Sequence, residues 1–180
     1  MSTRIVVTTG PESSGKTTLA GALSRQLGAP LVSEASRDYL GELYARQPGV
    51  AYRQQDLLAI ARLQLQREQA ALAQAPAVLV CDTDLLVIMV WSEVRFGNCD
   101  TELLDLFARS LQAAPRHYLL CDHRIPWEPD PLREHPHSRD MLYLHYMEKL
   151  ELLDLGFTRV TGPAPLRLQQ ALAAAAATGF

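Results

Sequence analysis

An eight-residue segment near the N-terminus has the composition of a phosphate-binding loop. The residues Gly10-Pro11-Glu12-Ser13-Ser14-Gly15-Lys16-Thr17 fit the pattern G-x-x-x-x-G-K-[ST], and they lie between a β-branched run and a run with helical spacing. Glycines let such a loop wrap closely, so that backbone N–H groups and the positive end of the next helix face phosphate oxygens. The spacing therefore predicts a loop that binds the phosphates of ATP.

The polar side chains of this loop have separate expected roles. Lys16 would place a point charge on the β and γ phosphates, and the Thr17 hydroxyl would ligate Mg²⁺. An ordinary glycine turn is the alternative, which the strand–loop–helix setting disfavours. We expect ATP and Mg²⁺ as cofactors, and ATP-binding roles for Gly10, Glu12, Ser13, Ser14, Gly15, Lys16, Thr17 and Thr18.

Acidic residues follow the expected second and third strands. Asp82 ends the third strand, where a carboxylate commonly holds the Mg²⁺ shell, although a solvated loop position is the alternative. Asp84 either contacts substrate or caps the helix that starts there. Glu34 is a candidate general base, with Asp82 as its rival. Arg37, one helical turn after Glu34, either contacts the substrate or pairs with Glu34.

The two tryptophans and the arginines of a proline-rich segment are further candidates. Trp91 and Trp127 could stack on a flat ring of the substrate, or pack in the core. Segment 124–139 holds four prolines and many charges, and we expect a lid there. Lid arginines commonly meet the charge that develops on a transferred phosphoryl group, so Arg133 and Arg139 are predicted to be catalytic.

The elements that must position these residues alternate along the chain. Apolar runs predict strands at 4–10, 30–33, 77–81, 117–121 and 157–161. Helical spacing predicts helices at 16–27, 52–73, 85–95, 101–113, 139–154 and 165–177. Because the strands are apolar along their whole length, we expect a parallel sheet covered on both faces, with the site at the carboxyl ends of the strands.

Composition limits the remaining possibilities. A chain of 180 residues fits a single domain, 1–180, and its hydrophobic content of 48% supports a sizeable core. A net charge of −3 argues against nucleic-acid binding through a basic face. The apolar runs are too short to span a membrane. Three cysteines, two of them in apolar runs, predict reduced core thiols in a cytoplasmic protein. The oligomeric state is left open.

Together with the loop, three further motifs give the chain a family resemblance. The motifs Glu34-x-x-Arg37, Cys81-Asp-Thr-Asp84 and Ile125-Pro-Trp127 make it resemble the ribosylnicotinamide kinase domain of NadR-type proteins, from residue 4 to about 172. The resemblance implies a P-loop kinase-like, three-layer α/β/α fold with a five-stranded parallel sheet and a short lid. It also implies that Asp130, in the Pro-Trp…Asp…Arg lid pattern, contacts substrate. Pro131 stands where that pattern has glycine.

The resemblance implies a nucleoside kinase activity. The expected reaction is Mg-ATP-dependent phosphorylation of a hydroxyl, with the 5′-OH of nicotinamide riboside as the best single acceptor. This would place the protein in NAD biosynthesis. NadR-type proteins also carry an adenylyltransferase domain, which we do not expect in this chain. The alternative function is a regulatory or partner-linked P-loop ATPase, which transfers phosphate only to water.

Overall fold

The computed structural model describes residues 3–126 and 138–177, and a parallel sheet lies at its centre. The strands run in the order β2-β3-β1-β4-β5, and each neighbouring pair is parallel. The predicted five-stranded parallel sheet is therefore confirmed. The strands are β1 (Arg4–Thr9), β2 (Leu31–Val32), β3 (Val78–Asp82), β4 (Arg116–Cys121) and β5 (Phe157–Val160).

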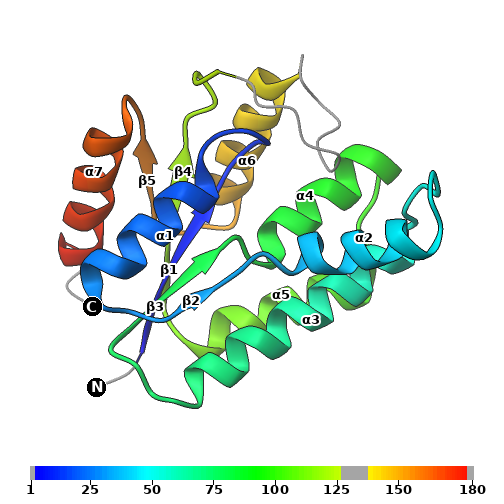
Figure 1. Cartoon of the computed structure of the whole chain (residues 1–180), viewed down its shortest axis with the longest axis horizontal. Coiled ribbons are helices and arrows are strands. Elements are labelled where there is room, and N and C mark those ends of the chain that lie inside the picture. The colour runs from blue at the N-terminus through cyan, green and yellow to red at the C-terminus, as the bar shows by residue number, and fades with distance from the viewer. Residues whose placement is uncertain (1–2, 127–137, 178–180) are drawn as a thin grey trace.

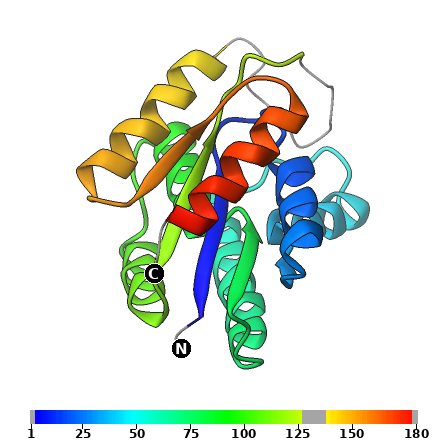
Figure 2. The ribbon, with the colours of Figure 1, turned by 90° about the vertical axis from the view of Figure 1, so that its left-hand side faces the viewer.

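Helices cover both faces of the sheet (Figures 1 and 2). On one face α1 (Lys16–Leu27) packs beside α7 (Ala164–Ala177). Helices from the rest of the chain pack on the other face. These are α2 (Ala35–Arg46), α3 (Gln54–Leu72), α4 (Leu85–Phe96), α5 (Thr101–Ala113) and α6 (Arg139–Leu152). The arrangement is the expected three-layer α/β/α architecture.

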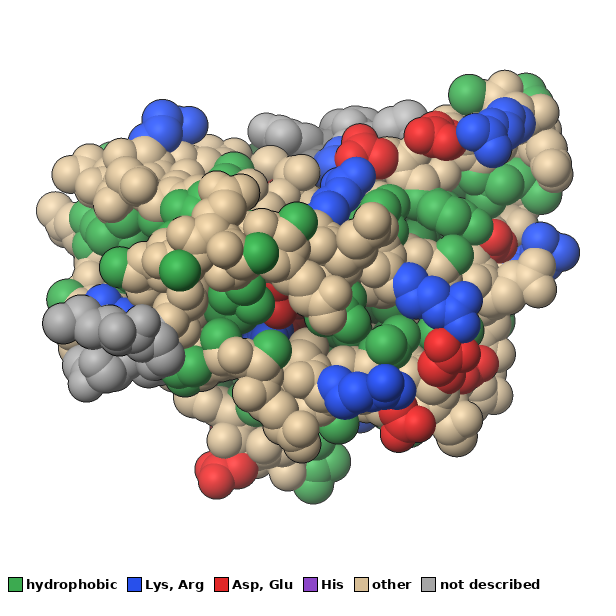
Figure 3. Space-filling model, turned by 90° about the horizontal axis from the view of Figure 1, so that it is seen from below, with side chains coloured by type: hydrophobic (Ala, Val, Ile, Leu, Met, Phe, Trp, Pro, Cys, Tyr) green, Lys and Arg blue, Asp and Glu red, His purple; other side chains and the backbone are tan. Residues whose placement is uncertain are grey.

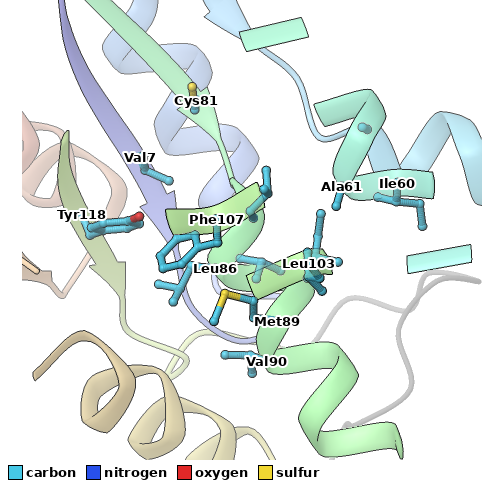
Figure 4. Packing of buried hydrophobic residues seen from close by; sticks show 14 of the residues in the cluster. Val7, Ile60, Ala61, Cys81, Leu86, Met89, Val90, Leu103, Phe107 and Tyr118 are labelled. Carbon is cyan, nitrogen blue, oxygen red and sulfur yellow. The ribbon is translucent and has the colours of Figure 1, made fainter. Parts of the chain in front are cut away.

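The strands divide their side chains between two cores with the two-residue period of extended backbone. In β1, Ile5 and Val7 join the larger core, whereas Val6 joins the smaller core under α1 and α7. Figure 4 shows the larger core, where Val7 and Tyr118 of the sheet lie opposite Leu86 and Phe107 of the helices. Both faces of each central strand are therefore apolar, which explains the continuous apolar runs in the sequence.

Helix α2 is an element that the sequence analysis did not predict. Its apolar positions Tyr39, Leu40, Leu43 and Tyr44 have helical spacing, and all four belong to or pack against the larger core. Gly41 interrupts this pattern, and glycine costs about 1 kcal/mol relative to alanine inside a helix. Packing on α3 outweighs that cost.

The surface carries mixed charge. On the face in Figure 3, basic and acidic side chains lie next to one another rather than in a single basic patch. Ion pairs between surface side chains of opposite charge include Arg62–Glu102 and Arg67–Asp38. Within the described ranges, no helix has both the length and the apolar character needed to cross a bilayer. Cys81, Cys99 and Cys121 are free thiols, and Cys81 and Cys121 are buried as expected.

Candidate active site

The phosphate loop (residues 10–17) joins β1 to α1 at the carboxyl edge of the sheet (Figure 1). Its backbone has positive φ at Gly10 (127°), Ser13 (52°) and Gly15 (78°). A Cβ on Gly10 would lie 2.9 Å from the carbonyl oxygen of Cys121, so only glycine fits beside β4 at this position. The glycines of the pattern thus allow the loop to curl over the sheet edge.

A cavity of about 160 Å³ opens over the loop and extends toward α2 and α4. It brings together Lys16 and Glu34, which are far apart in the sequence but were both predicted to act on the reaction. The cavity, called the loop cavity below, is lined by Glu12, Ser13, Ser14, Gly15, Lys16, Thr17, Thr18, Glu34, Ser36, Arg37, Trp91, Ile125 and Pro126.

Two side chains of the loop suit an anionic ligand. The Lys16 ammonium donates hydrogen bonds to the carbonyl oxygens of Gly10 (3.0 Å) and Pro11 (2.7 Å), which keeps its charge over the loop. The Ser14 hydroxyl is buried in the loop and has no hydrogen-bond partner among the described residues. A buried hydroxyl without a partner costs about 1–3 kcal/mol, and a phosphate oxygen could supply the missing acceptor.

Asp82 ends β3 close to Thr17 of the phosphate loop, and these are the two residues that were predicted to hold Mg²⁺. Thr8 Oγ1 lies 3.4 Å from Asp82 Oδ1, and the Thr17 hydroxyl lies close enough to the Asp82 carboxylate to lower its pKa. Burial raises the pKa of Asp82 and nearby Glu34 raises it further, while Thr17 and Lys16 oppose this rise. Oxygen donors beside a phosphate loop fit Mg²⁺, which usually takes one or two protein ligands plus phosphate and water.

A dedicated protein cage for a metal is not found in residues 3–126 and 138–177. No group of three or more His, Cys, Asp or Glu side chains there could hold an ion. Thr17 and Asp82 would therefore have to share the ion with the ligand. This matches the way in which Mg²⁺ is bound together with nucleotide phosphates.

Glu34 lies at the rim of the loop cavity with its carboxylate held by its neighbours. Ser36 Oγ donates to Glu34 Oε1 at 2.7 Å, and Arg37 Nε lies 3.4 Å from Oε2. The Glu34 side chain is only 12% exposed, whereas that of Arg37 is 42% exposed. The sequence left Arg37 as a substrate contact or an ion-pair partner, and the structure shows the ion pair at a position that also lines the cavity.

Trp91 of α4 also lines the loop cavity. Its side chain lies near that of the buried Tyr146 of α6. Trp91 also lines a smaller hollow of about 20 Å³ behind the loop, together with Tyr44 and Tyr52. The indole is half-buried and not enclosed in the core, so one part of it is available to a ligand.

Asp84 lies in the core and not on a cavity wall, contrary to the prediction of a substrate contact. Its side chain is fully buried and caps α4 by accepting a hydrogen bond from Leu86 N at 3.0 Å. Its other oxygen accepts from Arg116 Nη1 (2.9 Å) and Tyr118 Oη (2.7 Å). These donors occupy the carboxylate, so the alternative role as a helix cap holds.

Arg139 is the one lid-segment candidate in the described part of the chain. Its guanidinium donates to the carbonyl oxygens of Ser13 (3.3 Å) and Ile125 (3.1 Å). It therefore lies against the outer side of the phosphate loop. The other candidates of the lid segment, Trp127, Asp130 and Arg133, lie outside the described residues.

Two residues near the site were missed in the sequence. Buried Gln64 of α3 accepts a hydrogen bond from Ala35 N (2.8 Å) and donates to Thr83 O (3.5 Å), so it connects the segments that carry Glu34 and Asp82. Arg167 of α7 contacts the phosphate loop from behind. Both lie on helices far along the chain, and no motif identifies them.

Comparisons with known proteins were made at the level of family, sequence and structure. A family model described as an AAA domain matches residues 5–165. No curated protein matches the chain. Among solved structures, the NadR protein in complex with NR is 19% identical, with a TM-score of 0.68 over 99% of this chain and 52% of that chain. A second NadR structure, with NAD and AMP-PNP, gives the same identity and TM-score.

Two complete kinase chains are also similar. Thymidylate kinase from Ehrlichia chaffeensis is 13% identical, with a TM-score of 0.64 over 100% of both chains. Deoxyadenosine kinase from M. mycoides is 15% identical, with a TM-score of 0.59 over 98% of this chain and 100% of that chain. These likenesses confirm the P-loop kinase-like fold. The chain spans about half the length of the NadR chains.

Proposed function

This chain belongs to the AAA domain family, and from that premise we propose that it is a Mg-ATP-dependent kinase of a small molecule. The observation that carries the proposal is one shared cavity. Lys16 and Thr17 of the phosphate loop line it together with the carboxylate of Glu34 and the indole of Trp91. A phosphate donor and a hydroxyl acceptor could therefore meet between the loop and α2.

The phosphate loop would hold the donor. Backbone N–H groups at the start of α1 and the Lys16 ammonium stabilise the negative charge of the phosphates. Thr17 and Asp82 would hold Mg²⁺, which when bound neutralises charge on the phosphate oxygens. Burial raises the pKa of Asp82, whereas a nearby cation would lower this pKa and so favour the ionised form.

Glu34 would accept the proton of the attacking hydroxyl. The acceptor oxygen forms a bond to the γ-phosphorus, the bond to the β-phosphate oxygen breaks, and ADP leaves with that electron pair. Glu34 is favoured over Asp82 as the base because it lines the cavity, whereas Asp82 is buried and its carboxylate lies beside the Thr8 hydroxyl. Ser36 and Arg37 orient the Glu34 carboxylate.

We propose a nucleoside-like acceptor, with nicotinamide riboside as the leading candidate. Trp91 offers an aromatic face beside Glu34, and an aromatic face attracts a flat cationic ring more strongly than a neutral one. The NadR structures with the same fold were solved with NR and with NAD and AMP-PNP. Deoxyadenosine kinase, also similar, was solved with dCMP and dCDP, so deoxynucleosides belong in the same test.

The test is an ATP-consumption screen of the purified protein against a panel of nucleosides that includes nicotinamide riboside, with shikimate and gluconate as non-nucleoside acceptors for comparison. Product identity would be checked by mass spectrometry as the gain of one phosphate on the acceptor. The proposal requires turnover with a nucleoside that exceeds turnover in its absence. ATP consumption that no acceptor increases would contradict it.

A regulatory ATPase is the second candidate, and the match to an AAA domain model favours it. Such a protein would hydrolyse ATP with water as the only acceptor. The same screen separates the two functions, because phosphate release without any phosphorylated acceptor is the result expected of the ATPase. The placement of Glu34 and Trp91 around one cavity supports the kinase.

A further inference from the structure

A buried arginine from the last helix lies directly behind the phosphate loop. Arg167 is 5% exposed, and its guanidinium donates three hydrogen bonds to backbone carbonyl oxygens. Nη1 donates to Ser14 O at 2.5 Å, Nη2 to Asp122 O at 2.5 Å, and Nε to Gly162 O at 2.9 Å. One side chain therefore joins the loop to the ends of β4 and β5.

The charge of Arg167 has no carboxylate partner in the described part of the chain. Its hydrogen-bond acceptors there are three neutral carbonyl groups, and no ion pair to it occurs among those residues. A buried cation is costly unless it is paired. A phosphate bound on the other side of the loop would supply this missing negative charge. The Ser14–Gly15 peptide would lie between the phosphate and the guanidinium.

Holding a carbonyl outward fixes the direction of the next amide. The peptide between Ser14 and Gly15 is trans, and in a trans peptide the C=O and the N–H point in opposite directions. Since the Ser14 carbonyl points to Arg167, the Gly15 N–H points away from Arg167. It therefore points to the inner side of the loop.

Arg139 makes the same kind of contact one peptide earlier. It donates to Ser13 O at 3.3 Å, so the following N–H, that of Ser14, is also directed away from an arginine. Two consecutive amides are thus oriented by arginines from α6 and α7. Successive backbone N–H groups of a phosphate loop form an anion-binding nest when they face one ligand, and these two amides belong to such a loop.

We propose that Arg167 is a positioning residue for phosphate binding, which pre-sets the Gly15 amide and adds a buried positive charge behind the loop. This inference rests on the proposed nucleotide-binding function. It concerns the loop alone and does not depend on the identity of the acceptor. Gly15 suits the contact, because a Cβ there would lie 3.1 Å from Arg167 Nη1.

The test compares Arg167→Met, Arg167→Lys and Arg159→Met with the wild type. Arg159 is an exposed arginine of β5 whose guanidinium contacts Met147 and not the loop. Its replacement removes the same charge as Arg167→Met without a loop contact. Binding of pyrophosphate and of MgADP would be measured by calorimetry, and folding by urea unfolding without ligand.

We expect Arg167→Met to weaken pyrophosphate binding about 10- to 100-fold, the size typical of losing hydrogen bonds to a charged group. Arg167→Lys should recover part of this loss, because it restores the charge and one donor. Arg159→Met should bind within about twofold of the wild type. In ¹⁵N-glycine-labelled protein, pyrophosphate should shift the Gly15 amide resonance in the wild type and less in Arg167→Met.

A purely structural Arg167 would give a different result. Folded Arg167→Met protein that binds pyrophosphate as tightly as the wild type would overturn the proposal, whatever its loss of stability. If Arg167→Met does not fold, Arg167→Lys decides the question, because unchanged binding by that variant would also overturn it. A wild type that binds neither ligand refutes the nucleotide-binding function, whereas one that binds MgADP without phosphorylating an acceptor refutes only the kinase.

Discussion

Asp84 and Arg116 form an ion pair in the centre of the protein, with Asp84 Oδ2 2.9 Å from Arg116 Nη1. Both side chains are at most 2% exposed, and Glu68 Oε1 lies 2.9 Å from Arg116 Nη2. Burial alone would lower the pKa of Arg116, but the two carboxylates raise it. The guanidinium is therefore charged, and it joins α3 and β4 to the segment that follows β3.

Asp84→Ala should lower the free energy of unfolding by about 3–5 kcal/mol, because it leaves the Arg116 charge without one of its partners. It also removes the cap of α4. Urea unfolding at pH 7 measures the change. As a control, Asp105→Ala removes an exposed carboxylate of α5 and should change stability by less than about 0.5 kcal/mol. A loss below about 1 kcal/mol for Asp84→Ala would refute the structural role.

Replacement of Asp82, two residues before Asp84, should change the free energy of unfolding in the opposite direction. Its folded-state pKa is raised by burial, so above that pKa the charged carboxylate destabilises the folded, ligand-free protein. Below the ordinary aspartate pKa of about 3.9, both states are protonated and the penalty disappears. Asp82→Asn should therefore stabilise the ligand-free protein at pH 7, and its advantage should shrink as the pH falls toward 4.

The same substitution should remove Mg²⁺-dependent turnover, because amide oxygen is a weaker ligand than carboxylate for Mg²⁺. Urea unfolding at pH 7 and pH 4, with Mg²⁺ titrations of activity, tests both parts. Wild-type Mg²⁺ dependence in Asp82→Asn would remove Asp82 from the proposed metal site. Destabilisation at pH 7 would show that the polar contacts of the Asp82 carboxylate, such as that with Thr8, outweigh the burial of charge.

Asp82 and Asp84 show which features of the site could be predicted from the sequence and which could not. The strand that ends in Asp82 and the loop pattern around Lys16 are local features, so the sheet and the phosphate loop could be predicted from them. The pairing of Asp84 with Arg116 spans 32 positions and depends on how β3 and β4 lie in the sheet. From the sequence alone, Asp84 could be either a substrate contact or the cap of the helix that follows it.

The features that the sequence analysis missed also depend on contacts between distant parts of the chain. Arg167 reaches the loop across 153 positions, because α7 packs beside α1. Helix α2 was missed because Gly41 lies between its apolar residues, and its stability comes from the contact with α3. A local pattern does not record a contact that forms only when distant elements pack together.

Lys16→Ala should reduce ATP turnover at least about 100-fold, because the ammonium acts on the phosphates where charge develops. Within residues 3–126 and 138–177 the Lys16 side chain donates only to loop carbonyls, so we expect the free energy of unfolding to change by less than about 1 kcal/mol. Arg25→Ala, an exposed basic position of the same helix, is the matched control and should retain activity. Normal turnover by folded Lys16→Ala protein would be incompatible with the phosphate-loop assignment.

Glu34→Gln should lower kcat by a factor of about 10²–10⁴, the usual contribution of a general base, and leave ATP binding nearly unchanged. The amide keeps the shape of the side chain but cannot accept the proton in the same way. Glu42→Gln, a 69% exposed position on α2, the helix that follows Glu34, should behave like the wild type. Steady-state kinetics decide the matter, and a kcat within threefold of the wild type would return the role of base to Asp82.

Trp91→Ala should raise KM for the acceptor and leave KM for ATP nearly unchanged, because the indole lines the loop cavity together with Glu34. Stacking of a flat ring on an aromatic side chain is worth roughly 1–3 kcal/mol. This corresponds to about a 5- to 150-fold loss of acceptor binding.

Trp91→Phe separates stacking from packing. It keeps an aromatic face but removes the indole N–H and part of the packing beside Tyr146, so it should restore most of the acceptor KM even where stability stays reduced. Kinetics with each substrate varied in turn, together with urea unfolding of both variants, provide the measurement. If both KM values rise equally in Trp91→Ala, or if stability falls without a kinetic change, then Trp91 serves the packing of α4 against α6 and not the acceptor.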